Sequence, residues 1–130
     1  MLDEMMVTKS TFPKVEWSLP NKPMCLDIGQ QNTKPIAVLG AVSRENGMDM
    51  YMLFKKSVDQ MKFKTFLQEL RDKYPFDDIH LIMDNLSVHK TLSVRERMDE
   101  LGFEYSWIPP YSPQYNGIEE VWSQVKRKIK

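Results

Sequence analysis

Hydrophobic and polar positions along the chain predict a β-hairpin in its first half. Two apolar runs, residues 35–42 and 48–54, have the length of strands. Between them stands Asn46-Gly47, a dipeptide that favours tight hairpin turns because both residues tolerate a positive φ angle. Residues 9–35 are interrupted by four prolines and are expected to form an ordered loop or a short hairpin.

A helix is predicted directly after this hairpin. Ser57 is expected to cap its N-terminus, because a serine hydroxyl can accept a hydrogen bond from the first free N–H groups. The dipeptide Tyr74-Pro75 is expected to end it, since the residue before a proline is disfavoured in helical conformation. Between these limits the apolar residues recur at the spacing of a single buried helical face: Phe63, Phe66, Leu67 and Leu70.

The second half of the chain alternates between strand and helix patterns. Residues 79–83 and 103–108 read as strands, and residues 91–101 read as a short helix that Gly102 closes. Residues 109–113 contain three prolines and fit neither a helix nor an inner strand. A final helix is predicted from an apolar face made of Ile118, Val121, Trp122, Val125 and Ile129. Strands that alternate with helices predict an α/β fold, with a mixed central sheet because of the hairpin.

Length and composition narrow the class of protein. The 130 residues fit one ordinary domain, and a composition of 42% hydrophobic and 28% charged residues is typical of a globular chain. No apolar run approaches the roughly 20 residues that cross a bilayer, and the acidic start does not resemble a signal peptide. The single cysteine, Cys25, excludes an internal disulfide and a tetrahedral cysteine–zinc site. We therefore expect a protein that is neither secreted nor membrane-bound.

The formal net charge of zero conceals an uneven distribution. The last ten residues carry four basic side chains and no acidic one, so the first 120 residues have a net charge of −4. This basic end is either a nucleic-acid contact or simply a solvated, fraying helix end.

Three carboxylates are candidates for chemistry. Asp84 follows a predicted strand, at the edge where α/β sheets place their ligands. Glu119 falls in the first turn of the last helix, and Asp3 lies at the start of the chain. Each carboxylate could also have no role in catalysis. A strand-end aspartate is often a turn residue, and a glutamate in a first turn often only interacts favourably with the helix dipole.

Two segments closely resemble the signature blocks of the mariner-type DDE transposases, a superfamily that joins eukaryotic mariner elements to a group of bacterial insertion sequences. One segment runs from Asp84 to His89 and the other from Pro109 to Arg127. The superfamily pattern is an aspartate, a second aspartate followed by asparagine, and a glutamate in an Asn-Pro-Ile-Glu block after a proline-rich loop. In this chain 34 residues separate Asp84 from Glu119, a spacing characteristic of the superfamily. Asp3-Glu4, with Trp17 a short loop later, is similar to the block around the first catalytic aspartate.

This resemblance implies an RNase H-like fold in which Asp3, Asp84 and Glu119 are the catalytic residues. It also implies that these carboxylates bind two Mg²⁺ or Mn²⁺ ions, for which hard carboxylate oxygens are suitable ligands. Two such ions activate an attacking water or 3′-hydroxyl and stabilise the leaving oxygen during displacement at phosphorus. Asp3 and Asp84 are expected on neighbouring strands, with Glu119 presented by the helix opposite.

Further residues are expected to orient the ligands or to contact DNA: Asn85, His89, Ser123, Lys126 and Arg127. For His89 the alternative is an ordinary surface histidine at a helix entrance. Ser123 and Lys126 share a helical face with Glu119, and Lys126 is expected to contact phosphates, which position DNA without specifying its sequence. Trp122 is expected in the core.

The chain also departs from the superfamily pattern. Gly117 stands where the superfamily usually has proline, and only two residues precede Asp3. Residues 1–130 are therefore expected to form a single RNase H-like catalytic domain that is truncated before its first strand and has no helix-turn-helix domain.

The leading hypothesis is the catalytic domain of a DNA transposase, which cleaves and joins DNA strands at transposon ends and targets, with a homodimer in a full-length context. One alternative is a catalytically inactive or domesticated relic that binds DNA or protein. Another is a stand-alone RNase H-like nuclease. The transposase-like segment from Pro109 to Arg127 makes this alternative less favoured. The expected location is the nucleus in a eukaryote and the cytoplasm in a bacterium.

Overall fold

The protein is described here by a computed structural model, in which residues 1–7 and 34–129 are placed. The loop or hairpin expected at residues 9–35 therefore lies outside the described residues, except for Lys34 and Pro35. Among the described residues, no helix is long and apolar enough to cross a membrane.

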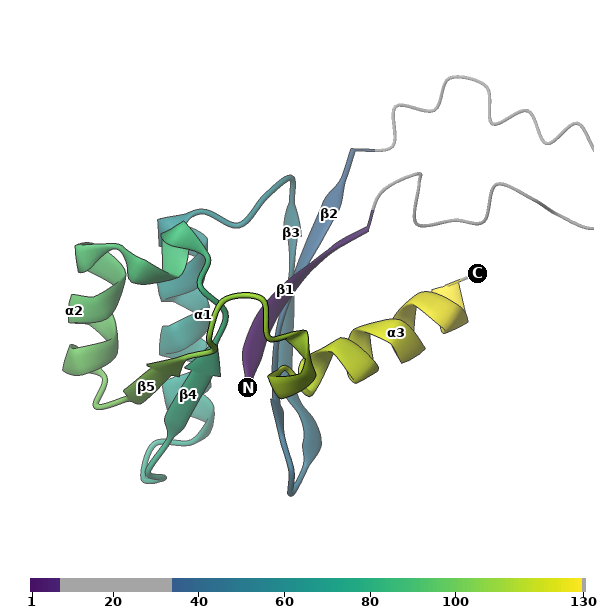
Figure 1. Ribbon diagram of the computed structural model, residues 1–130. Helices are drawn as coiled ribbons and strands as arrows, with labels where there is room; N and C mark the ends of the chain where they lie inside the picture. The colour runs from purple at the N-terminus through teal and green to yellow at the C-terminus, as the bar shows by residue number, and fades with distance from the viewer. Residues whose placement is uncertain (8–33, 130) are drawn as a thin grey trace, which may run out of the picture.

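A five-stranded mixed sheet forms the centre of the fold, in the order β3-β2-β1-β4-β5 (Figure 1). The strands are β1 (Leu2–Val7), β2 (Ile36–Ser43), β3 (Gly47–Lys55), β4 (His80–Met83) and β5 (Glu104–Trp107). The pairs β3 with β2 and β2 with β1 are antiparallel, whereas β1 with β4 and β4 with β5 are parallel. The predicted mixed sheet is confirmed.

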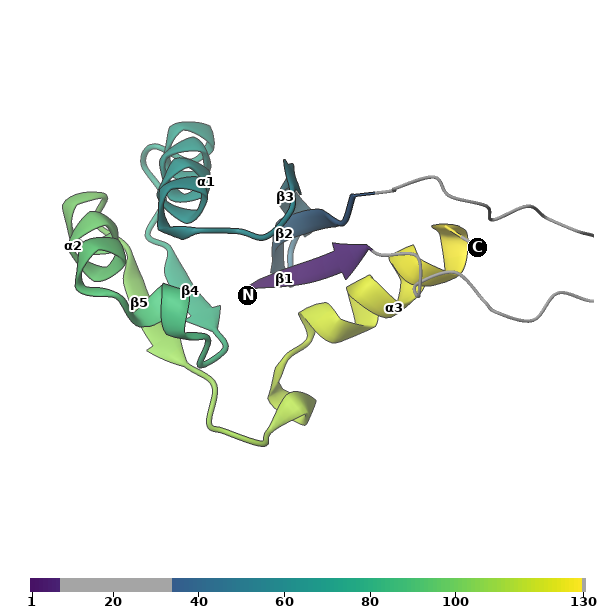
Figure 2. The same ribbon diagram turned by 90° about the horizontal axis from the view of Figure 1, so that it is seen from above.

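Helices cover both faces of this sheet. They are α1 (Gln60–Lys73), α2 (Leu92–Glu100) and α3 (Ile118–Ile129), with short 3-10 helices η2 (Ser87–Lys90) and η3 (Pro113–Tyr115). Figure 2 shows α1 and α2 on one side of the strands and α3 on the other. The three-layer arrangement leaves α3 alone opposite the two other helices.

The hairpin turn between β2 and β3 follows the sequence prediction. Gly47 has a φ of 71°, a conformation that glycine adopts without steric cost. The hydroxyl of Ser43 accepts a hydrogen bond from the Asn46 backbone N–H at 3.1 Å, and the Asp49 carboxylate accepts one from the Asn46 side chain at 2.9 Å. Side chains and backbone thus fix the same turn.

The predicted buried face of α1 is confirmed, but its predicted cap is wrong. Phe63, Phe66, Leu67 and Leu70 are all buried. The N-cap is Asp59, whose carboxylate accepts a hydrogen bond from the Lys62 backbone N–H at 2.9 Å. Asp59 takes this role because the helix begins two residues later than Ser57 predicts.

The short helix expected at residues 91–101 is α2, which buries Val94 and Met98 and leaves Leu92 71% exposed. Leu92 is the first helical residue and projects from the end of the helix, away from the core. Gly102 has a φ of 73° and directly follows the C-cap, as predicted.

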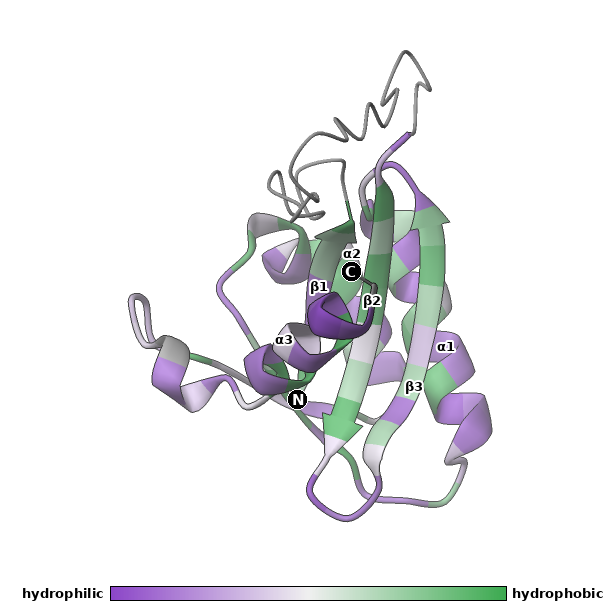
Figure 3. Cartoon of the chain, turned by 90° about the vertical axis from the view of Figure 1, so that its right-hand side faces the viewer, coloured by the Kyte–Doolittle hydropathy of each residue, from purple (hydrophilic) through white to green (hydrophobic). Residues whose placement is uncertain are grey.

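A second apolar cluster attaches α3 to the opposite face of the sheet. Its buried members are Met5, Val38, Val42, Ile118 and Trp122, and Figure 3 shows α3 crossing hydrophobic positions of β2. Gly40 permits this approach, because a Cβ there would lie 2.5 Å from Trp122 Cη2. Trp122 is a core residue, as the sequence predicts.

Candidate functional site

A cleft of about 410 Å³ lies at the carboxyl end of β4, between β1, the proline-rich loop and the start of α3. Its lining includes Asp3, Asp84 and Glu119. The register of the sheet explains how two of them meet: Leu2 pairs with Met83 on the parallel neighbour, so the next residue on each segment is an aspartate. The structure therefore brings the three predicted carboxylates into one cleft.

Asp3 is the most buried of the three, with 7% of its surface exposed. Its Oδ1 accepts a hydrogen bond from the Glu4 backbone N–H at 2.7 Å, and its Oδ2 accepts one from Asn116 Nδ2 at 3.1 Å. Burial raises the pKa of Asp3, and the charges of Asp84 and Glu119 raise it further, against the lowering effect of these hydrogen bonds. A cation in the cleft would relieve both unfavourable effects.

Asp84 is held in place by His89. The Nδ1 atom of His89 lies 2.9 Å from Asp84 Oδ1, at ion-pair distance but not aligned as a hydrogen bond. The Leu86 backbone N–H donates to the same oxygen at 3.2 Å. The close imidazole lowers the pKa of Asp84, so this carboxylate is ionised at neutral pH.

His89 is fully buried, which rules out the alternative of a surface histidine. The sequence does not reveal this burial because His89 packs on Phe63 and contacts Glu4, and both residues are distant in the chain. Burial alone would lower the pKa of His89, but contacts with Asp84 and Glu4 outweigh it and raise the pKa to about 9. The imidazole therefore carries a positive charge at neutral pH between two carboxylates.

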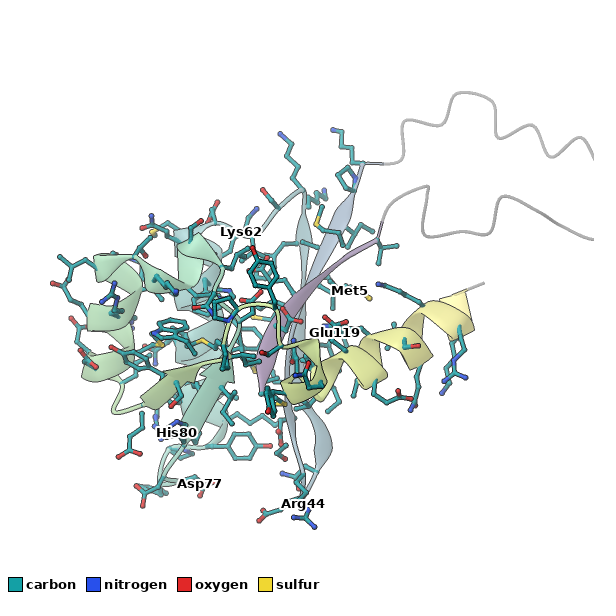
Figure 4. All side chains as sticks on the ribbon, in the orientation of Figure 1. Met5, Arg44, Lys62, Asp77, His80 and Glu119 are labelled. Carbon is teal, nitrogen blue, oxygen red and sulfur yellow. The ribbon has the colours of Figure 1, made fainter. Side chains whose placement is uncertain are left out.

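Glu119 approaches the cleft from the other side. It belongs to the first turn of α3, where its backbone N–H donates to the Asn116 carbonyl oxygen at 3.1 Å. Figure 4 shows Glu119 at the end of α3 that lies against β1. Its side chain is exposed, so its position is set by the helix rather than by contacts of its own.

The remaining predicted residues divide into two groups. Asn85 lines the cleft and donates a hydrogen bond to the Ile108 carbonyl oxygen, which ties the end of β4 to the proline-rich loop. Ser123, Lys126 and Arg127 are exposed on α3 and do not line the cleft. Their expected contact with DNA stays a prediction.

Two polar residues of the cleft were not predicted from the sequence. Glu4 lines the cleft and accepts a hydrogen bond from His89, and Asn116 donates one to Asp3. Both lie within the segments that carry the family resemblance, directly after Asp3 and three residues before Glu119. Their positions in these segments could have marked them as site residues. Their hydrogen-bond partners could not be found from the sequence, because His89 is 85 residues from Glu4 and Asp3 is 113 residues from Asn116.

The donor set fits a hard divalent cation in its chemistry. All three predicted ligands supply carboxylate oxygens, the type that Mg²⁺ and Mn²⁺ prefer. Within residues 1–7 and 34–129, however, no three histidine, cysteine, aspartate or glutamate side chains lie close enough together to hold one ion. Like charges repel one another, and Glu119 is exposed, so the carboxylates share the cleft without forming a closed coordination shell.

Comparison with known proteins gives one family and one group of similar structures. A family described as DDE superfamily endonuclease matches residues 1–130. No curated protein sequence matches significantly. Among solved structures, the Mos1 transposase paired-end complex with the left transposon end aligns with a TM-score of 0.71 and 18% identity, over 98% of this chain and 40% of that one.

Two further Mos1 structures are similar. The Mos1 mariner paired-end complex with Mn has a TM-score of 0.63 and 15% identity, over 98% of this chain and 47% of that one. The Mos1 catalytic domain with raltegravir and Mg has a TM-score of 0.55 and 17% identity, over 72% of this chain and 53% of that one. The chain therefore spans about half or less of the length of these proteins, and the likeness confirms the RNase H-like fold.

Proposed function

The chain belongs to the DDE superfamily endonuclease family, and on that premise we propose that it is a transposase catalytic domain that cleaves and joins DNA strands. The observation that carries this proposal is the cleft shared by Asp3, Asp84 and Glu119. These residues come from two neighbouring strands and a helix, so the fold alone gathers carboxylates that are far apart in the sequence.

We propose further that Asp3, Asp84 and Glu119 would hold two Mg²⁺ or Mn²⁺ ions in the same cleft. Bound there, the ions would activate a water or 3′-hydroxyl and stabilise the leaving oxygen at phosphorus. The His89 imidazole holds the pKa of Asp84 below its ordinary value, so this carboxylate is available as a ligand. Asp3 is buried beside other carboxylates, so it gains most from a nearby positive charge.

DNA is the proposed substrate. Mos1 structures of similar fold are described as a paired-end complex with the left transposon end and as a strand transfer complex. In this chain the exposed basic residues Lys126, Arg127 and Lys128 lie in the last turn of α3, where they can contact phosphates without reading bases. We also propose recognition of particular transposon ends, a homodimer in a full-length context, and a nuclear location in a eukaryote or a cytoplasmic one in a bacterium.

A plasmid-nicking assay tests the proposal. Supercoiled DNA is incubated with the chain in Mn²⁺, in Mg²⁺ and in EDTA, and an RNA–DNA hybrid is offered in parallel. We expect slow, sequence-indifferent nicking of DNA that requires the metal and falls with rising salt. Preference for the hybrid would favour a stand-alone RNase H-like nuclease, and cleavage of neither substrate in either metal would favour an inactive relic. No observation on the described residues favours either alternative.

A further inference from the structure

A buried imidazole connects two strands behind the cleft. His89 is fully buried, and its ring stacks on Phe63 with 4.5 Å between centroids and 30° between planes. Its Nε2 lies 3.2 Å from Glu4 Oε1, and its Nδ1 lies 2.9 Å from Asp84 Oδ1. Each ring nitrogen therefore faces a carboxylate from a different strand or strand end.

The position of Glu4 allows this contact. Strands β1 and β4 share one paired position, Leu2 with Met83, and β1 then continues away from β4 (Figure 2). Glu4 stands just beyond that position, and its side chain is 16% exposed. The carboxylate of Glu4 thus reaches the imidazole in the opening between the two strands.

The orientation of Asp84 depends on this chain of contacts. Phe63 limits the tilt of the imidazole ring, and Glu4 fixes its rotation by accepting from Nε2. The contacts that the described residues make with Asp84, from His89 and from the Leu86 N–H, all go to Oδ1. This arrangement directs Oδ2 toward other partners, and groups behind a ligand commonly orient it for a cation.

We propose that Glu4 is a positioning residue, which holds His89 and through it orients the Asp84 carboxylate for a divalent cation. The inference rests on the proposed metal-dependent function and adds a residue to it. Glu4 also lines the cleft, but its carboxylate is engaged by His89, so its proposed role is to position Asp84 rather than to serve as a fourth ligand.

Replacements of Glu4 separate these roles in the full chain. Glu4→Gln keeps the length and one acceptor for His89 Nε2 but removes the charge. Glu4→Asp keeps the charge but is one methylene too short to reach the ring. Glu104→Gln is the matched control, because Glu104 lies 3.3 Å from His80 Nδ1 on the exposed surface, on β5. The measurement is the dissociation constant for Mn²⁺, from the electron paramagnetic resonance signal of the free ion.

The positioning role predicts a distinct order of affinities. Glu4→Gln should bind Mn²⁺ within about threefold of wild type, whereas Glu4→Asp should bind roughly 10-fold more weakly, the size of effect seen when a ligand loses its outer partner. Glu104→Gln should change nothing. Metal-free melting curves of each variant show whether the chain is folded.

Other outcomes overturn the inference. If Glu4→Asp binds better than Glu4→Gln, Glu4 is itself a ligand, because a carboxylate then matters more than the hydrogen bond. If both variants bind Mn²⁺ as wild type does, Glu4 only supports the fold. Absence of Mn²⁺ binding by the wild-type chain would instead overturn the proposed function, and the inference with it.

Discussion

The two walls of the cleft are built in different ways. On the sheet wall, Asp84 is fixed by His89 and by a backbone N–H, and the imidazole behind it is fully buried. On the helix wall, Glu119 is exposed and is carried by α3, which a small apolar cluster around Trp122 attaches to the sheet. Ligand geometry is therefore set by polar contacts on one wall and by helix packing on the other.

Because of this difference, a substitution at Glu119 should change the nicking rate without changing the stability of the fold. Glu119→Ala should reduce metal-dependent nicking at least about 1,000-fold, or about 4 kcal/mol of barrier. It should leave the melting temperature within about 1 °C, because the exposed side chain contributes little packing. The measurement is the initial nicking rate in Mn²⁺ together with a thermal melt.

Glu120→Ala is the matched control for this prediction. Glu120 is the next residue of the same helical turn, is also exposed, and has its Oε1 3.3 Å from Gln124 Nε2. It should keep nicking near the wild-type rate. Nicking by Glu119→Ala at an undiminished rate, in a nuclease-free preparation, would remove Glu119 from the mechanism.

The packing of α3 is tested at Trp122. Trp122→Ala should lower the free energy of unfolding by about 3–5 kcal/mol, a large share of the stability of a domain this size. Because α3 carries Glu119, nicking should also fall in the protein that stays folded. Urea unfolding and the nicking assay measure the two effects.

A milder change at the same position sharpens that test. Trp122 Nε1 is buried and has no hydrogen-bond partner among the described residues. Trp122→Phe therefore removes an unsatisfied donor while it keeps most of the packing, and it should cost less than half as much as Trp122→Ala. Equal losses in the two variants would show that the stabilisation comes from the outer ring of the indole against Gly40, which a phenylalanine side chain does not reach.

The buried carboxylate of the sheet wall is tested with and without metal. Millimolar Mn²⁺ should raise the wild-type melting temperature by several degrees, because ligands that bind only the native state stabilise it. Asp3→Asn should raise the metal-free melting temperature by a few degrees, since it removes a buried charge beside Asp84 and Glu119. The same variant should lose most of the gain from Mn²⁺.

Asp99→Asn, an exposed position on α2, controls for the change of net charge. It should leave both the metal-free melting temperature and the Mn²⁺ response unchanged. A metal-free loss of stability in Asp3→Asn would mean that its hydrogen bonds to Glu4 and Asn116 outweigh the repulsion. An unchanged wild-type melt in Mn²⁺ would count against a metal site.

Local patterns predicted most of the fold because local forces determine it. The hairpin at Asn46-Gly47 and the buried face of α1 depend on residues within a few positions of one another, so the sequence displays them directly. The error at Ser57 arose because both Ser57 and Asp59 can accept the capping hydrogen bond, and in the structure Asp59 accepts it.

The candidate site was predictable only in part. Asp84 and Glu119 stand at a strand end and in a helix first turn, which the sequence pattern marks. The burial of His89 and the contact of Glu4 depend on how β1 and β4 separate beyond one paired position, which no local pattern encodes. Nonlocal geometry therefore decides which polar residues orient the ligands.

The smallest expected effect concerns the basic end of α3, far along the helix wall from Glu119. Lys126→Ala combined with Arg127→Ala should weaken DNA binding several-fold, equally for all sequences, because phosphate contacts carry no base information. Each lost contact should reduce the slope of log affinity against log salt by about 1. Fluorescence anisotropy with two unrelated duplexes at several salt concentrations measures both quantities. The control, Arg44→Ala with Lys55→Ala, removes the same charge from exposed positions of the hairpin turn and of β3, and Figure 4 shows Arg44 away from Glu119. If the control reduces the slope as much as the α3 pair does, binding follows net charge rather than a contact surface on α3.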